Sequence, residues 1–178
     1  VGDRMLAAAG NMWIAAGQPG KAAAALDKAL AGTGLLGQQR GEALLDRARA
    51  AEAQGDLKTA RAKVTAAAET IGKDAFLWYF SAALAIREND PATAKVAIGR
   101  ALALEPNDPT VLFEAGHVFH FAGDEAKARA YWTRAAAADP KGKSGDAARQ
   151  ALAMLDVPLT VTSQVTSQKV GEGEKGRQ

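Results

Sequence analysis

Residues 75–108, AFLWYFSAALAIRENDPATAKVAIGRALALEPND, and residues 109–142, PTVLFEAGHVFHFAGDEAKARAYWTRAAAADPKG, decide the fold because they are two copies of one pattern. Laying the chain against itself at a shift of 34 residues adds a third copy at residues 41–74, with no gap or insertion. A fourth copy, at residues 3–36, precedes these and is displaced by the four extra residues GQQR. Periods of about 20 to 50 residues are typical of proteins built from stacked repeats.

Three positions of the repeat hold only alanine or glycine. They are Gly10, Ala48, Ala82 and Gly116; Ala22, Ala60, Ala94 and Ala128; and Ala29, Ala67, Ala101 and Ala135. Other positions hold large apolar residues, such as Leu112 and Trp132 in the last copy. Small side chains let two helices approach to the short end of a range of about 8 to 10 Å between their axes. The pattern therefore predicts closely crossed helix pairs.

Turn and capping residues set the expected helix boundaries. The turn position holds Gly17, Gly55, Asn89 and Gly123, which are residue types that readily adopt a positive φ. The aspartates before Pro91, Pro109 and Glu125 are predicted N-caps, with each proline at a first helical position. We expect helices at residues 3–16, 19–31, 38–54, 57–71, 74–88, 91–104, 109–122, 125–138 and 144–156.

The repeat resembles the tetratricopeptide repeat (TPR) family, whose unit is a 34-residue helix-turn-helix. The resemblance covers roughly residues 3–142. It is strongest in the last copy, at Leu112, Gly116, Phe119, Gly123, Ala128, Trp132, Ala135 and Pro140. The second copy departs from the family pattern, with Arg47 in place of leucine and Gly72 in place of proline.

The resemblance implies an all-α fold, an α-solenoid of about four stacked TPR-like units. The units lie near residues 3–36, 41–74, 75–108 and 109–142. Residues 144–156 keep apolar residues on one stripe with polar residues opposite, as expected of a helix that caps a stack. We therefore expect one superhelical domain over residues 1–156. Residues 157–178 change to β-branched and polar residues, which predicts a tail that is flexible or docked on a surface.

Composition and charge exclude several classes of function. The chain has 22 basic and 20 acidic residues spread along its length, so no basic stripe predicts nucleic-acid binding. Its apolar runs are shorter than the roughly 20 residues of a membrane span, so we expect no membrane insertion of the body. The sequence leaves the compartment open: we expect a soluble protein that is cytoplasmic, or periplasmic if an N-terminal targeting segment before Val1 was removed.

No motif for catalysis or cofactor binding is found in the sequence. A phosphate-binding loop, a nucleophile elbow and cysteine are all absent, which predicts a protein that is not an enzyme and has no cofactor. Glu114, His117 and His120 follow one another at steps of three residues, a spacing that can place metal ligands on one helix face. Chance produces this spacing easily and a fourth strong ligand is missing, so we predict no metal site.

The resemblance also implies that the first helix of each pair lines the concave side of the stack. Helical spacing places a set of aromatic, histidine and arginine side chains on that side: Asn11, Leu45, Arg49, Phe76, Tyr79, Ile86, Arg87, Phe113, His117, His120 and Phe121. Clustered aromatics and arginines often carry binding energy, so this groove is predicted to bind a peptide or short helix of a partner protein. We expect Arg49 and Arg87 to be available for a carboxylate of that partner.

Two alternatives to this site remain open at this point. Aromatic residues at helical spacing often pack in a core, so some of these rings could lie between adjacent first helices. The groove or the tail after Asp156 could also dock on a second copy of the chain, which would make the protein a homo-oligomeric structural module.

Overall fold

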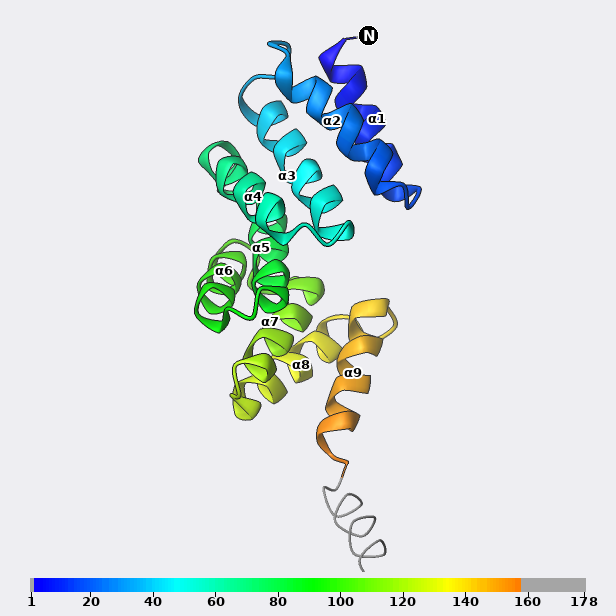
Figure 1. The fold of residues 1–178 in the computed structure, drawn as a ribbon. Coiled ribbons are helices and arrows are strands. Elements are labelled where there is room, and N and C mark those ends of the chain that lie inside the picture. Colours follow the sequence, from blue (N-terminus) through cyan, green and yellow to red (C-terminus); the bar gives the residue numbers. More distant parts are fainter. Residues whose placement is uncertain (1, 158–178) are drawn as a thin grey trace, which may run out of the picture.

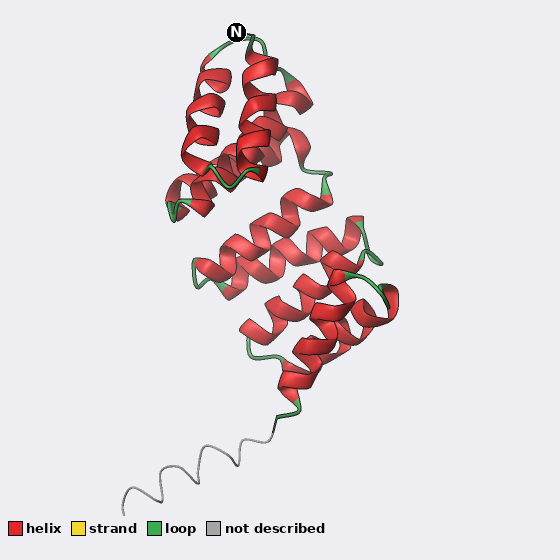
Figure 2. Cartoon of the chain, turned by 90° about the vertical axis from the view of Figure 1, so that its right-hand side faces the viewer, coloured by secondary structure: helices red, strands yellow, loops and turns green. Residues whose placement is uncertain are grey.

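The structure is a computed structural model, and it describes residues 2–157. This part of the chain contains nine α-helices and no strand (Figures 1 and 2). They are α1 (Asp3–Ala15), α2 (Pro19–Ala31), α3 (Gly37–Ala53), α4 (Leu57–Ile71), α5 (Ala75–Arg87), α6 (Pro91–Leu104), α7 (Pro109–Phe121), α8 (Glu125–Ala138) and α9 (Lys143–Leu155). Each boundary lies within one residue of its predicted position. The predicted tail from residue 158 onward lies outside the described residues.

Local chemistry explains where the helices begin and end. Asp90, Asp108 and Asp124 are N-caps whose carboxylates accept hydrogen bonds from backbone N–H groups of the first turn. The side-chain and backbone hydrogen bonds from Thr93 hold the pKa of Asp90 below its ordinary value. The turns after α1, α3, α5 and α7 each use the predicted residue with positive φ: Gly17, Gly55, Asn89 and Gly123.

Each first helix packs against the helix that follows it through the small-residue positions. All twelve alanines and glycines of these positions are buried. At Gly116, an added Cβ would lie 2.3 Å from the indole ring of Trp132. At Gly10 it would lie 2.5 Å from Leu26. The notch left by a missing side chain is thus filled by a large residue of the partner helix, as the sequence predicted.

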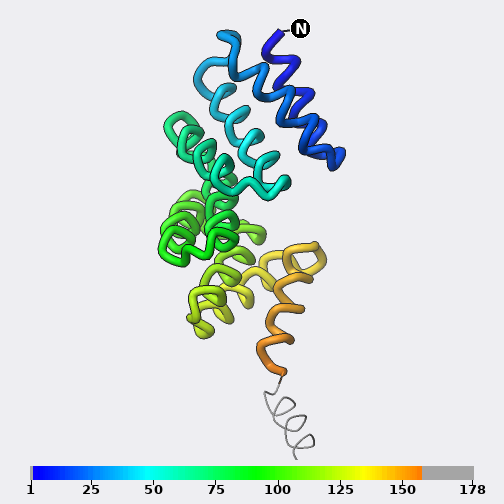
Figure 3. Tube along the Cα trace, in the orientation of Figure 1, coloured from blue at the N-terminus to red at the C-terminus, as the bar shows by residue number. Residues whose placement is uncertain are grey.

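The helix pairs follow one another along a curved stack, with α1 at one end and α9 at the other (Figure 3). First helices of neighbouring pairs touch, as in the pairs α1 and α3, α5 and α7, and α7 and α9. The second helices α2, α4, α6 and α8 make no comparable contact with one another. The first helices therefore lie on the inside of the curve. The predicted all-α solenoid is confirmed.

The junction between the second and third pairs is the most polar one. The backbones of α3 and α5 contact each other less than other neighbouring first helices do. Arg61 on α4 bridges to α5 instead, because its guanidinium donates to the Ser81 hydroxyl at 2.8 Å and pairs with Glu88. The carbonyl of Gly72, where the family prefers proline, accepts a hydrogen bond of 2.7 Å from the Trp78 indole. Side-chain hydrogen bonds thus add to the apolar cluster that Leu77 and Leu84 of α5 form with α4 at this junction.

Candidate functional site

The surface formed by α1, α3, α5, α7 and α9 on the inside of the curve is called the inner face. Three hollows lie along it, each between neighbouring first helices or at their ends. One lies between α1 and α3, one at the N-terminal ends of α5 and α7, and one between α7 and α9. Most of the predicted site residues that keep exposed surface line or flank these hollows.

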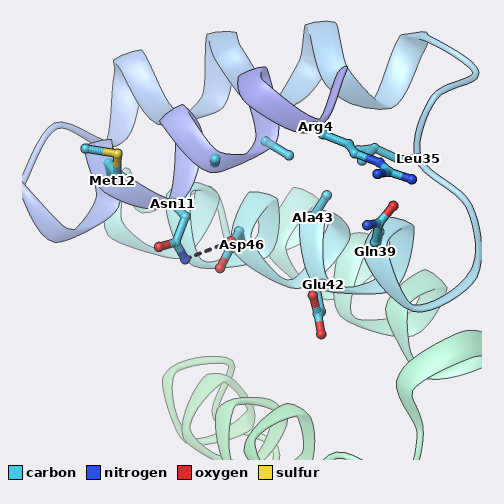
Figure 4. A pocket seen from close by; sticks show the side chains of 10 residues that line it. Arg4, Asn11, Met12, Leu35, Gln39, Glu42, Ala43 and Asp46 are labelled. Carbon is cyan, nitrogen blue, oxygen red and sulfur yellow. Dashed lines mark hydrogen bonds between the residues drawn. The ribbon is translucent and has the colours of Figure 1, made fainter. Parts of the chain in front are cut away.

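The hollow between α1 and α3 has a mixed lining of polar and apolar side chains and a volume of about 390 Å³. Arg4 and Gln39 lie at one end, and Asn11 and Asp46 lie at the other (Figure 4). The Asn11 amide donates a hydrogen bond of 3.0 Å to the Asp46 carboxylate. The amide of this predicted site residue therefore already has a hydrogen-bond partner inside the chain.

Both arginines of the predicted groove are paired with carboxylates of α3. Arg49 binds Asp46, with 3.1 Å between Nη1 and Oδ1, and its guanidinium lies 5.6 Å from the centre of the Phe76 ring. Arg87 pairs with the Glu52 side chain and also donates to the Glu52 carbonyl at 2.8 Å. A partner carboxylate would have to compete with these ion pairs, and the availability of the two arginines for such a group stays a prediction.

Leu45 is the one predicted groove residue that lies in the core. Its exposed fraction is 4%, and it packs in a cluster with Leu44, Ala48 and residues of α4 and α5. Tyr79 and Phe113 hold the same repeat position and keep part of their surface, since a ring reaches further than a leucine side chain. Ile86 and Phe121 are half-buried, and Ile86 packs against the core cluster between α5 and α7.

The N-terminal part of α5 carries a pair of aromatic rings beside the start of α7. Phe76 and Tyr79 stack with 5.7 Å between their ring centres, and they line a hollow with Thr110 and Val111. Burial raises the pKa of the Tyr79 hydroxyl, and the negative charge of Glu114 raises it further. Tyr79 is therefore a neutral hydrogen-bond donor at physiological pH.

The hollow between α7 and α9, called the α7–α9 pocket, has the most apolar lining of the three. It has a volume of about 450 Å³ and is lined by Phe113, His117, His120, Trp132, Ala151, Met154 and Leu155. The His120 ring lies 5.7 Å from the Trp132 ring, which forms part of the pocket floor. Both histidines are about half exposed, so they form a polar rim around an apolar interior.

Sequence reasoning missed the contribution of α9 to this pocket. Ala151, Met154 and Leu155 stand 34 residues after His117, His120 and Phe121, so α9 continues the inner face as a first helix without a partner. The repeat period, extended one unit further, would have identified them. Met154 is 74% exposed and is the most accessible apolar side chain of the pocket.

A buried carboxylate lies directly behind the pocket rim. Glu114 is 5% exposed, and its Oε1 atom has no hydrogen-bond partner among the described residues. The nearest basic atom is Nδ1 of His117, at 3.7 Å. The side-chain interaction with Glu114 raises the pKa of His117 above its ordinary value, and partial burial opposes this shift without cancelling it.

We expect the His117 imidazole to titrate above the ordinary histidine pKa of about 6.5. Its attraction to Glu114 stabilises the fold fully below that ordinary value and is lost as the pH rises through the elevated pKa of the folded state. NMR titration of the imidazole carbon resonances measures the shift, with a His120→Asn variant assigning the signal. In Glu114→Gln the pKa of His117 should fall; an unchanged value would show that Glu114 is not the cause.

Glu114, His117 and His120, the three residues considered as metal ligands, do not all pair with one another. His117 faces Glu114, whereas Nδ1 of His120 lies 2.7 Å from the carboxylate of Glu125. Within residues 2–157 no group of three histidine, aspartate or glutamate side chains is placed to hold a metal ion. In the same part of the chain, none of the helices has the length and hydropathy needed to span a bilayer.

The comparisons with known proteins identify the fold. No protein-family model matches the sequence, and no curated protein sequence matches it either. Two crystal structures of MamA, a TPR protein, have the same fold and are 17% identical in sequence to this chain. One superposes with a TM-score of 0.67 over 78% of this chain and 74% of MamA. The other has a TM-score of 0.68 over 78% and 79%.

Proposed function

We propose that the chain is a non-catalytic scaffold that binds a segment of another protein on its inner face. The TPR-like fold supports a role in protein interaction, because stacked repeats present an extended concave surface. The observation that carries the proposal is the α7–α9 pocket, an open hollow with aromatic, histidine and methionine side chains. Its volume of about 450 Å³ accommodates one aromatic or branched aliphatic side chain of a partner.

The chemistry of the pocket defines the kind of segment it would take. Phe113 and Trp132 give flat apolar walls, and the thioether of Met154 adapts to anchors of different shape. His117 and His120 can hydrogen-bond to the backbone of the bound segment through ring nitrogens at the rim. The aromatic pair Phe76 and Tyr79 offers a second apolar surface on the same inner face. A segment with apolar anchors therefore fits better than one with a terminal carboxylate.

The test uses peptides selected from a random display library against the intact protein. Met154→Glu should weaken binding of the selected peptides by about 5- to 150-fold, because a charge at the pocket mouth opposes burial of an apolar anchor. Phe113→Ala should have an effect of the same size by removing one wall. Isothermal titration calorimetry measures both affinities, and circular dichroism verifies that each variant is folded.

Met5→Glu is the matched control for this experiment. Met5 is 69% exposed and also lies on a first helix, but it lines none of the three hollows of the inner face. Its substitution should leave peptide affinity unchanged. Peptides that bind Met154→Glu and Phe113→Ala as tightly as the wild type would refute the pocket as the anchor site.

A further inference from the structure

The Glu114 carboxylate lacks a hydrogen-bond donor although it is enclosed by the protein. Glu114 is the one charged residue that is buried among residues 2–157, and its Oε1 atom has no hydrogen-bond partner there. A buried polar atom without a partner destabilises the structure that contains it, and the effect is larger for a charged group. Such an atom on a binding face therefore points to a donor that a ligand supplies.

An earlier copy of the repeat shows how this position is satisfied within the chain. Asp46 on α3 holds the repeat position of Glu114 on α7. Its carboxylate accepts a hydrogen bond of 3.0 Å from Asn11 of α1 and another of 3.1 Å from Arg49. Asn11 and Asp46 both line the hollow between α1 and α3, where Figure 4 shows them meeting across the two helices. A carboxylate at this position thus turns toward the preceding first helix on the inner face.

Both of these donors are missing around Glu114. Ala83 of α5 holds the position of Asn11, and its methyl group cannot donate a hydrogen bond. His117 holds the position of Arg49, and its Nδ1 atom lies 3.7 Å from Oε1, which is longer than a hydrogen bond. The only arginine or lysine on α5 and α7 is Arg87, which pairs with Glu52 of α3. In the described part of the chain, Glu114 therefore has no arginine or lysine partner.

Glu114 lies between two of the hollows on the inner face. On one side is Tyr79, which lines the hollow at the start of α7 and whose pKa is raised in part by the charge of Glu114. On the other side is His117, a half-exposed residue at the rim of the α7–α9 pocket. A segment that runs along the inner face from one hollow to the other therefore passes the Glu114 carboxylate.

We infer that Glu114 binds an arginine or lysine side chain of the partner segment, in the place that Asn11 and Arg49 take at Asp46. The inference rests on the proposed function, because it defines one residue of the segment bound on the inner face. A guanidinium or ammonium group brings N–H donors and a positive charge together, which is what the carboxylate lacks. A charge-assisted hydrogen bond of this kind is also stronger in a shielded site than at an exposed surface.

The spacing of the first helices sets the place of the basic residue in the segment. Neighbouring helix axes lie about 8 to 10 Å apart, and an extended chain rises about 3.3 Å per residue. Glu114 lies on the α5 side of α7, whereas the α7–α9 pocket lies on the other side. In an extended segment, the basic residue should therefore stand about three positions from the apolar anchor.

Peptides from the random display library test the inference through a double-mutant cycle. Those whose binding is weakened by Met154→Glu should carry arginine or lysine about three positions from their apolar anchor. Replacing that basic residue with glutamine should weaken binding to the wild type by about tenfold, and binding to Glu114→Gln by less than about twofold. Isothermal titration calorimetry measures the affinities of all combinations, and circular dichroism verifies that Glu114→Gln is folded.

Glu69→Gln is the matched control, because it removes the same charge from an exposed position on α4. In this variant the loss on replacing the basic residue of the peptide should stay near the wild-type value. The inference is overturned if the peptides that use the pocket carry no such basic residue, or if Glu114→Gln keeps the full loss. Either result would leave the α7–α9 pocket standing as the anchor site.

A small cation tests the same carboxylate without a partner segment. Acetyl-arginine amide, added to about 50 mM at constant ionic strength, should shift the backbone NMR signals of Ala83 and Glu114. It should also lower the pKa of the His117 imidazole, since the bound cation offsets the charge of Glu114. Acetyl-citrulline amide has nearly the same shape without the charge and should do neither, and Glu114→Gln should not respond to the arginine compound.

This titration separates failure of the inference from failure of the proposed function. If the library yields no peptide that uses the α7–α9 pocket, the proposed function fails and the titration alone decides whether Glu114 is a cation site. A wild type that does not respond to acetyl-arginine amide would overturn the inference. So would an equal response to the citrulline compound, or an unchanged response in Glu114→Gln.

Discussion

Trp132→Ala should lower the free energy of unfolding by about 3–5 kcal/mol, which is the largest loss expected from a single substitution in this chain. The Trp132 side chain is 4% exposed and fills the notch that Gly116 leaves on α7. Its indole N–H also donates a hydrogen bond of 3.0 Å to the Phe113 carbonyl. The substitution removes this donor and opens a cavity between α7 and α8 that neighbouring side chains cannot fill.

Urea denaturation followed by circular dichroism measures this loss, and Trp13→Ala is the control. Trp13 is 37% exposed and Lys21 lies over its ring, so its replacement should cost about 1–2 kcal/mol, less than the loss at Trp132. Both variants are measured under the same conditions. If the two tryptophan variants were equally stable, the closely crossed α7 and α8 pair would not be a main source of stability.

The fold could be predicted from the sequence because its determinants are local and recur in each copy. A position where helices cross tolerates only a small side chain, so Gly116 and Ala128 repeat as glycine or alanine throughout. Capping aspartates such as Asp90 and turn residues such as Asn89 act within one helix turn of their own position. Such features are visible in a sequence without knowledge of distant contacts.

The candidate site could be predicted only in part, because side-chain pairing depends on residues far apart in the chain. Phe113 and His117, which the helical spacing placed on one face, both line the α7–α9 pocket. Arg87 pairs with Glu52, 35 residues earlier, and no short-range pattern indicates that pairing. Leu45 was placed by the same periodicity as Tyr79, but side-chain length decides which of them reaches the surface.

The exposed face of α1 around Met12 required the sequence and the structure together. Sequence alone gives Met12 as one more apolar residue of an amphipathic helix, which predicts burial. Only the comparison with Leu84 and Val118, which are buried at the same repeat position, shows that no helix within residues 2–157 covers this face of α1. In a repeat protein, the residues at one position of the other copies therefore show how buried a residue at that position is expected to be.

Leu84→Ala should lower the free energy of unfolding by about 2–5 kcal/mol, whereas Met12→Ala should change it by less than about 0.5 kcal/mol. The two residues hold the same position of the repeat and differ in whether a preceding helix covers them. Leu84 is 1% exposed and packs in the cluster that joins α4 to α5, so its truncation leaves a cavity at the repeat junction. Met12 has no helix of residues 2–157 over it and is 70% exposed, so its truncation removes little buried surface.

Chemical denaturation followed by circular dichroism compares the two variants under the same conditions. Equal costs for the two truncations would mean that Met12 is covered as Leu84 is, which would contradict the 70% exposure of its side chain.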